Sequence, residues 1–209
     1  MSFNFTQAEF DQWAATYDAD ANTRASWVAH EKVAQVVDGH KPGIPVSHVV
    51  DLGTGTGLLL PYLKKEFAAA TLTGIDLSEN MIEECRKKGL ADHLIQHDLT
   101  AGDWPIGKES AQLVTASGVL EFVRDSDTFI ANAAAILQKD GIAAMTYQLP
   151  LMGKRPGIGA SPTYSHLPRN VEASFTKAGM GILDHADFIA YRQYGVAVHY
   201  GLIAAQKLG

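Results

Sequence analysis

The chain has 209 residues, of which 46% are hydrophobic and 19% charged, and its formal net charge at pH 7 is −6. We expect a single domain over residues 1–209, while the acidic balance disfavours a nucleic-acid partner and the lack of about 18 consecutive apolar residues disfavours a membrane span. The single cysteine, Cys85, and an N-terminus without a basic and apolar leader pattern favour a cytoplasmic location.

Residues 1–40 are expected to form a helical cap ahead of the first strand. The capping-box spacing of Thr6 and Glu9 predicts a helix start. The aromatic and apolar residues that follow share one helical face: Phe10, Trp13, Ala14 and Tyr17. A second helix is expected over about residues 24–37, ending at Gly39. Such a cap is placed to cover a ligand bound to the domain behind it.

The central motif is the stretch 49–57, Val-Val-Asp-Leu-Gly-Thr-Gly-Thr-Gly. Apolar residues lead into an acid, and a helical pattern over 58–67 follows the glycines. This pattern predicts a buried parallel strand over 47–51 that turns sharply into a helix. Ligands of such sheets bind at the carboxyl ends of the strands, where glycine allows a tight turn and a close approach.

The glycine spacing argues against a dinucleotide. The fingerprint G-x-G-x-x-G would require a third glycine at Leu58 or Leu60, so an NAD-dependent oxidoreductase is disfavoured. Asp51 inside the motif suits a cationic amine and would repel a diphosphate. The alternative interpretation is a glycine-rich turn that binds nothing.

The second strand is expected over 71–76 and ends in Asp76. An acid about 20 residues after the glycines is placed to accept hydrogen bonds from ribose hydroxyls, although it does not distinguish one nucleoside cofactor from another. Ser78 is a candidate N-cap for a helix over 79–88, which Gly89 would close. The alternative role for Asp76 is that of an acid near a helix N-terminus.

His93 and His97 have the spacing of two metal ligands on a helix, but we expect a third strand there. On a strand, four residues span about 13 Å, which is too far for two ligands of one metal ion. No metal is therefore expected.

The second half continues the alternation of strands and helices. We expect strands over 112–117 and 142–147, a helix over 126–139 and a helix from Pro168. Two closing strands are expected over 182–192 and 196–206. The long segment 150–168 holds four of the eight prolines and is expected to be a substrate-side loop.

The arrangement D-x-G-x-G-x-G from Asp51 to Gly57 resembles motif I of the class I S-adenosylmethionine (SAM)-dependent methyltransferases of the small-molecule type. The segment from Trp13 to Asp18 is similar to the W-x-x-x-Y-D entry segment of these enzymes. Residues 117–123, Ser-Gly-Val-Leu-Glu-Phe-Val, resemble the segment that lies beneath the sulfonium. The turn 139–141 departs from the family's Pro-Gly-Gly.

The resemblance implies an α/β fold, a three-layer αβα sandwich with a seven-stranded, mostly parallel sheet of order 3-2-1-4-5-7-6. Strand 7 would be antiparallel, and the helical cap would be an N-terminal extension. SAM would be the cofactor, S-adenosylhomocysteine the product, and a small molecule the acceptor at oxygen or nitrogen. We expect a monomer or homodimer. The cofactor-binding residues implied are Tyr17, Asp51, Gly53, Thr54, Gly55, Gly57, Asp76, Leu77, Ser78, Met81, Asp98, Leu99, Ser117 and Gly118.

Tyr164 and His166 are the catalytic candidates, because they resemble a Y-x-H segment that some of these enzymes place over the methyl group. A base matters only if the acceptor must lose a proton, and histidine titrates near neutrality. We expect Glu121 to be an exposed acid near a helix start, with a place on the substrate side as the alternative. Methylation of protein or RNA, and a non-catalytic SAM-binding module, remain as alternatives.

Overall fold

A seven-stranded sheet forms the middle layer of the computed structural model, which describes residues 7–21, 26–151, 163–193 and 195–209. The strand order is β3-β2-β1-β4-β5-β7-β6. Strands β1 to β5 are parallel, and β7 runs antiparallel between β5 and β6. This confirms the expected topology. The strands are β1 (His48–Leu52), β2 (Thr71–Asp76), β3 (His93–Gln96), β4 (Ala111–Ala116), β5 (Leu137–Gln148), β6 (Met180–Gln193) and β7 (Val196–Lys207).

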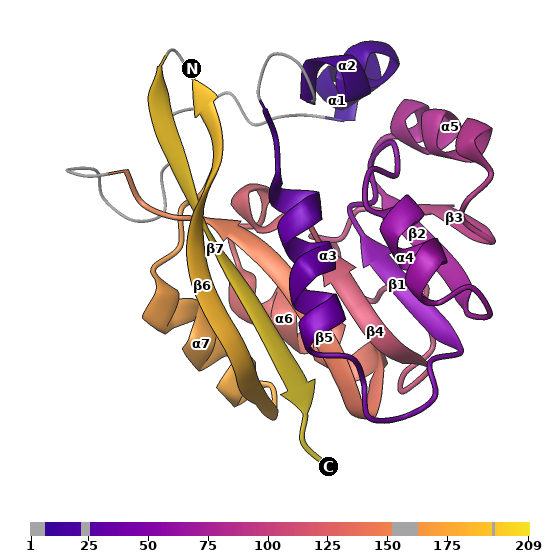
Figure 1. Ribbon diagram of the computed structural model, residues 1–209, viewed down its shortest axis with the longest axis vertical. Helices are drawn as coiled ribbons and strands as arrows, with labels where there is room; N and C mark the ends of the chain where they lie inside the picture. Colours follow the sequence, from indigo (N-terminus) through magenta and orange to yellow (C-terminus); the bar gives the residue numbers. More distant parts are fainter. Residues whose placement is uncertain (1–6, 22–25, 152–162, 194) are drawn as a thin grey trace.

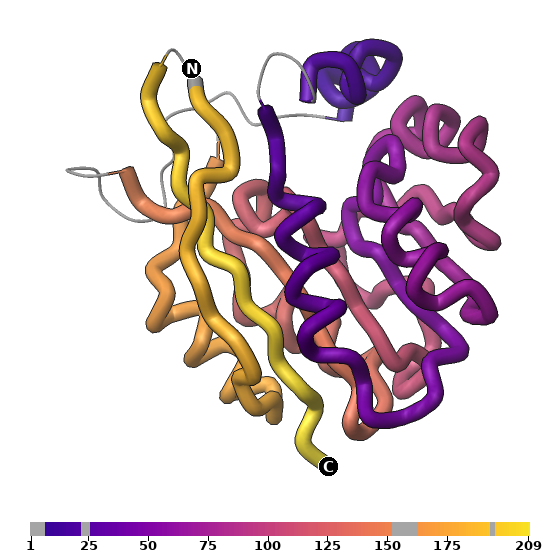
Figure 2. Tube along the Cα trace, viewed as in Figure 1, coloured from indigo at the N-terminus to yellow at the C-terminus, as the bar shows by residue number. Residues whose placement is uncertain are grey.

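Helices cover both faces of the sheet (Figure 1). On one face lie α3 (Ala29–Gly39), α4 (Leu60–Glu66) and α5 (Glu79–Lys88), and on the other lie α6 (Ser126–Ile136) and α7 (Pro168–Lys177). A further segment, α1 (Gln7–Trp13), η1 (Ala14–Thr16) and α2 (Tyr17–Ala19), lies beyond the carboxyl ends of the parallel strands. The tip of the β6–β7 hairpin also lies toward the carboxyl ends of the parallel strands (Figure 2).

The central strands are apolar on both sides because each side has its own core. Val49 and Leu113 pack in the cluster that includes residues of α3 and α4. Their neighbours Val50 and Val114 pack in the cluster that includes residues of α6 and α7. Successive side chains of a strand point to opposite faces, so a strand covered on both faces reads as an unbroken apolar run.

Both ends of α5 agree with the sequence expectation. The Ser78 hydroxyl accepts a hydrogen bond from the Met81 N–H at 3.1 Å, which is the N-cap contact. Gly89 ends the helix with a φ of +63°, a left-handed conformation that glycine adopts without a Cβ penalty. The proposed cap at Thr6 lies outside the described residues.

The boundary between α6 and β5 differs from the prediction. The helix ends at Ile136 rather than at residue 139, and the strand begins at Leu137 rather than at residue 142. Leu137 is buried and pairs in parallel with Ala111, so it belongs to the strand rather than to the helix. Asp140 has a φ of +63°, which is incompatible with a continuing right-handed helix.

Two helices are also shorter than expected at their starts. The described part of α3 begins at Ala29, after Ser26 with a φ of +50°, so the helix cannot run unbroken from residue 24. Helix α4 begins at Leu60, with Pro61 in its first turn, because residues 53–59 form the glycine turn. Most of the predicted substrate-side loop, residues 152–162, lies outside the described residues.

Candidate active site

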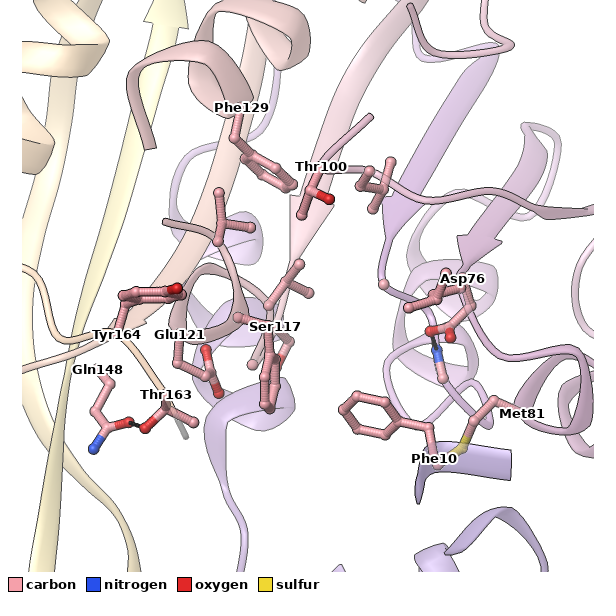
Figure 3. Close-up of a pocket in the computed structure, with 18 of the residues that line it drawn as sticks. Phe10, Asp76, Met81, Thr100, Ser117, Glu121, Phe129, Gln148, Thr163 and Tyr164 are labelled. Carbon is pink, nitrogen blue, oxygen red and sulfur yellow. Dashed lines mark hydrogen bonds between the residues drawn. The ribbon is translucent and has the colours of Figure 1, made fainter. Parts of the chain in front are cut away.

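A cavity of about 1160 Å³ lies at the carboxyl ends of the parallel strands, beneath the α1–α2 segment. Two groups of residues line its opposite sides (Figure 3). We call the side of Phe10, Asp76 and Met81 the Asp76 end, and the side of Glu121, Gln148 and Tyr164 the Glu121 end. A volume of this size holds a large cofactor together with a small second ligand.

The glycine turn after β1 forms part of the cavity wall. Gly53, Gly55 and Gly57 all have positive φ angles, of +63°, +55° and +84°. A Cβ on Gly53 would lie 2.4 Å from Cγ2 of Val119, and one on Gly57 would lie 2.8 Å from Sγ of Cys85. A Cβ on Gly55 would meet nothing within 4 Å, although Gly55 lines the cavity. Gly55 therefore leaves room for a ligand, whereas Gly53 and Gly57 are required by close packing.

Asp76, the last residue of β2, lines the cavity and ties two turns together. Its Oδ2 accepts a hydrogen bond from the Gly55 N–H at 2.7 Å, and its Oδ1 accepts one from the Ser78 N–H at 2.9 Å. Burial raises the pKa of Asp76, while these backbone N–H groups oppose the rise. The side chain is thus a fixed acceptor at the wall of the cavity.

Asp51 is more deeply buried than Asp76. It is buried, accepts a hydrogen bond from the Thr115 hydroxyl at 2.7 Å, and has a pKa raised to about 6 by burial. Asp51 and Thr54 line a second, smaller cavity of about 40 Å³, which also touches Tyr17 and His30. Tyr17, Gly53, Gly55 and Ser117 line both cavities.

The wall on the α5 side carries most of the remaining expected cofactor residues. Those lining the large cavity are Leu77, Met81, Asp98 and Leu99. Ser78 is fully buried, and its hydroxyl donates to Oδ1 of Asp11 at 2.5 Å while capping α5. Ser78 therefore acts in the structure as a link between α5 and the N-terminal segment.

The α1–α2 segment is held over the Asp76 end by acidic side chains. Oδ1 of Asp18 accepts from the Thr56 hydroxyl at 2.5 Å, and its Oδ2 pairs with Nζ of Lys88 at 2.6 Å. Three aromatic residues of the segment, Phe10, Trp13 and Tyr17, line the cavity below it. The Trp13 and Tyr17 rings meet edge to face, with centroids 4.8 Å apart.

The turn after β4 forms the floor between the two ends. Gly118 has a φ of +73°, and its N–H donates to the Thr146 hydroxyl at 2.9 Å. A Cβ on Gly118 would lie 2.7 Å from Cζ2 of Trp27, so the indole packs directly on the backbone here. Ser117 and Gly118, two of the predicted cofactor-binding residues, both line the cavity.

Glu121 is not the exposed acid that the sequence analysis favoured. It lies in η3 (Leu120–Phe122), it is only 3% exposed, and it lines the cavity. Its Oε1 accepts a hydrogen bond from the Tyr200 hydroxyl at 2.7 Å. Its Oε2 is buried without a hydrogen-bond partner among the described residues. Burial raises the pKa of Glu121 to about 7.

No local signal in the sequence predicts this burial. Tyr200 comes from β7, at 79 positions from Glu121 along the chain. The Tyr200 ring packs against Trp27 and Tyr191, with centroid distances of 5.4 and 6.2 Å. Cavity-lining residues that the sequence analysis did not identify include Trp27, Gln148, Thr163, Tyr191, Arg192 and Tyr200.

The two catalytic candidates lie in different surroundings. Tyr164 lines the cavity, and its N–H donates to the Glu121 carbonyl at 2.6 Å. The His166 ring is buried behind the η3 turn, with Nε2 2.9 Å from the Leu120 carbonyl, and burial lowers its pKa. A carbonyl only accepts, so Nε2 carries the proton in this contact. His166 is absent from the described residues that line the cavity.

Neither a metal centre nor a membrane span is found in the part of the chain that the structure describes. No three His, Cys, Asp or Glu side chains are grouped there in a way that could hold a metal ion. Every helix in that part falls short of the length and apolarity needed to cross a bilayer.

Comparison with known proteins gives a family match, related sequences and solved structures of the same fold. Residues 50–145 match the family model described as "Methyltransferase domain". The chain is 31% identical over 169 residues to trans-aconitate 2-methyltransferase of Paracidovorax citrulli, which covers 78% of this chain and 61% of that protein. The chain thus spans about three-fifths of the length of that relative.

Solved structures share the fold at low sequence identity. The Burkholderia thailandensis 1,6-didemethyltoxoflavin-N1-methyltransferase, solved with S-adenosylhomocysteine, has a TM-score of 0.71 and 16% identity, covering 97% of this chain and 87% of that one. The [4+2]-cyclase SpnF has a TM-score of 0.69 and 17% identity, covering 86% and 81%. Residues 50–145, with motif I at Asp51 to Gly57, therefore match a methyltransferase domain, and the strand order of the sheet is that of the class I SAM-dependent methyltransferase fold.

Proposed function

We propose that the chain binds SAM at the Asp76 end of the cavity and transfers its methyl group to a small molecule at the Glu121 end. The single observation that carries this proposal is one cavity of about 1160 Å³ that joins both ends beneath the α1–α2 segment. A covered cavity suits a cofactor and a small acceptor, since a macromolecular acceptor needs an open approach.

The residues of the Asp76 end fit the cofactor. Gly55 leaves open space where any other residue would place a Cβ, and the fixed carboxylate of Asp76 suits ribose hydroxyls. In the proposal, the amino acid portion lies by Asp51, Gly53, Thr54 and Gly55, with Tyr17 above it. Leu77, Met81, Asp98 and Leu99 surround the base, while Ser117 and Gly118 lie below the sulfur. Gly57 and Ser78 shape this wall through packing and hydrogen bonds.

When bound, SAM supplies a methyl group on a positively charged sulfur. Displacement at that carbon must be in line, so the main task of the chain is to hold the acceptor on the correct axis. Methyl acceptors named for the relatives include small molecules, and the net charge of −6 disfavours nucleic acid here. Both observations support a small acceptor.

Isothermal titration with SAM, S-adenosylhomocysteine and NAD tests the binding half of the proposal. We expect SAM and S-adenosylhomocysteine to bind and NAD not to bind. Binding of NAD alone would contradict the proposal. The release of S-adenosylhomocysteine over a panel of phenols, carboxylic acids and amines tests transfer. SAM binding without turnover of any acceptor would favour a non-transferring role, which the fold shared with a cyclase makes a concrete alternative.

A further inference from the structure

We propose that Glu121 is the proton acceptor in the reaction and that the Glu121 end takes a planar acceptor with a neutral phenolic hydroxyl. This inference rests on the proposed function and specifies its substrate class. It follows from the geometry of the Glu121 carboxylate, the charges around it and the aromatic walls of this end.

The carboxylate has one oxygen anchored and one without a hydrogen-bond partner. The Tyr200 hydroxyl holds Oε1 at 2.7 Å, which fixes the orientation of the side chain. Oε2 has no hydrogen-bond partner among the described residues, although the side chain is 97% buried and borders the cavity. A buried acceptor atom without a partner costs about 1–3 kcal/mol, so a ligand that donates a hydrogen bond there relieves that cost.

Three phenols of neighbouring elements interact electrostatically with the Glu121 carboxylate. They are Tyr17 of α2, Tyr191 of β6 and Tyr200 of β7, whose pKa values are raised by burial and by the nearby carboxylate. No lysine, arginine or histidine of the described segments forms an ion pair with Glu121. Arg124 and Arg192 line the same cavity but form no ion pair with the Glu121 carboxylate, so a neutral hydroxyl placed beside that carboxylate would find a base.

The ordinary pKa of a glutamate carboxyl makes the carboxylate a weak base. Burial raises the pKa of Glu121 and so makes its carboxylate a stronger base. With a pKa raised to about 7, Glu121 exchanges protons near neutral pH, which is where general bases are most effective. Glu121 lines the cavity, so its carboxyl group belongs to the cavity wall.

The proton and electrons balance without a further reactant. The acceptor hydroxyl gives its proton to Oε2 of Glu121, and the oxygen electron pair forms the new bond to the methyl carbon. The carbon–sulfur bond breaks with its electron pair on sulfur, which becomes neutral, and Glu121 later returns the proton to solvent.

The walls of this end favour a flat molecule. Tyr164, Tyr191 and Tyr200 line it with aromatic rings, and Figure 3 shows Tyr164 and Glu121 close together on this side. Phenols stack on such rings through offset or edge-to-face contacts. A flexible aliphatic acid would not gain these contacts.

A binding experiment tests the proton acceptor without turnover. The probe is 4-nitrophenol, added to the S-adenosylhomocysteine complex, because its ionised form absorbs visible light. We expect the wild-type complex to bind it and shift it toward the ionised form, and Glu121→Gln to bind it without that shift. The glutamine keeps an oxygen for the Tyr200 hydroxyl, so the variant preserves the anchor. Absence of binding, or an equal shift in both proteins, would overturn the proposal.

The affinities of the wild type and of Glu121→Gln for SAM and S-adenosylhomocysteine distinguish two roles of Glu121. It could accept the acceptor's proton, as proposed, or it could pair with the sulfonium of SAM. If Glu121 instead paired with the sulfonium charge, Glu121→Gln would weaken SAM binding and leave S-adenosylhomocysteine binding unchanged. We expect both dissociation constants to stay within about threefold, because the lost group acts on the acceptor. A selective loss of SAM affinity would overturn the proposal.

Kinetics with catechol as acceptor complete the test. We expect kcat to rise with pH through about 7 and Glu121→Gln to lower it by about 10²–10⁴-fold and flatten the profile. Glu79→Gln, an exposed glutamate on α5, is the matched control and should leave the profile unchanged. Turnover of carboxylic acids alone, unaffected by Glu121→Gln, would overturn the inference while leaving the proposed methyl transfer intact.

Discussion

The Tyr200 hydroxyl donates a hydrogen bond of 2.7 Å to Oε1 of Glu121 and so joins β7 to the turn after β4. This contact orients a buried carboxylate whose second oxygen has no partner among the described residues. Because the pKa of that carboxyl is raised to about 7 in the folded chain, its protonation is coupled to folding.

We expect the stability of the wild type, relative to Glu121→Gln, to fall as the pH rises. A carboxyl with a raised pKa holds its proton in the folded state, so folding is favoured at low pH. The advantage is lost between about 4.5, the ordinary value, and about 7, and amounts to about 3 kcal/mol over that range. Urea unfolding of both proteins at several pH values checks this. A constant difference would contradict the raised pKa.

Asp76→Ala should weaken SAM binding tenfold or more. Loss of charge-assisted hydrogen bonds costs about 1.5–3 kcal/mol. Asp92→Ala is a suitable control, because that carboxylate also accepts a backbone N–H, from Leu72, but does not line the cavity. Calorimetry of folded variants measures the effect, and an unchanged SAM affinity would remove Asp76 from the binding site.

Gly55→Ala should impair binding more than folding. Gly55 and Gly89 have similar φ angles, of +55° and +63°, and a Cβ on either meets nothing within 4 Å. Both alanine variants should therefore lose about 1–2 kcal/mol of stability from left-handed strain. Only Gly55→Ala places a methyl group in the cavity wall, so only that variant should lose SAM affinity. Equal SAM affinities for the two variants would show that no ligand approaches Gly55.

His166→Ala should lower stability and kcat without changing the pH profile of kcat. The buried His166 ring contacts the Leu120 carbonyl and thereby supports the turn that carries Glu121. Thermal unfolding and a pH series of initial rates measure the two effects. A His166→Ala variant with full activity would show that His166 has no part in the reaction. A variant that loses only the rise of kcat near pH 7 would show that His166 is the catalytic base.

The place of the cavity could be predicted from local patterns in the sequence, whereas the order of the strands was implied by the resemblance to the methyltransferase family. The run into Asp51 and the alternating glycines specify a strand, a turn and a helix within one short segment. Ser78 and Gly89 likewise mark the ends of α5 by their own chemistry.

Features that depend on distant partners could not be predicted in this way. The sequence around Leu137 has a helical pattern, but Leu137 is in a strand because it pairs with the distant Ala111. Glu121 is buried because the distant β7 supplies Tyr200 and its aromatic neighbours. The resemblance of residues 117–123 places Glu121 near the cofactor, but nothing in that segment shows that its carboxylate is buried.

The fixed orientation of the Asp76 carboxylate lowers the entropic cost of binding a ligand there. Both of its oxygens are already held by N–H groups of two neighbouring turns, so the carboxylate is oriented before any ligand arrives. Immobilising a free side chain on association costs about 0.5–1.5 kcal/mol, and here that ordering is completed when the chain folds. If SAM binds at Asp76 as proposed, we expect a substitution that loosens either turn to weaken SAM binding even where Asp76 itself is intact.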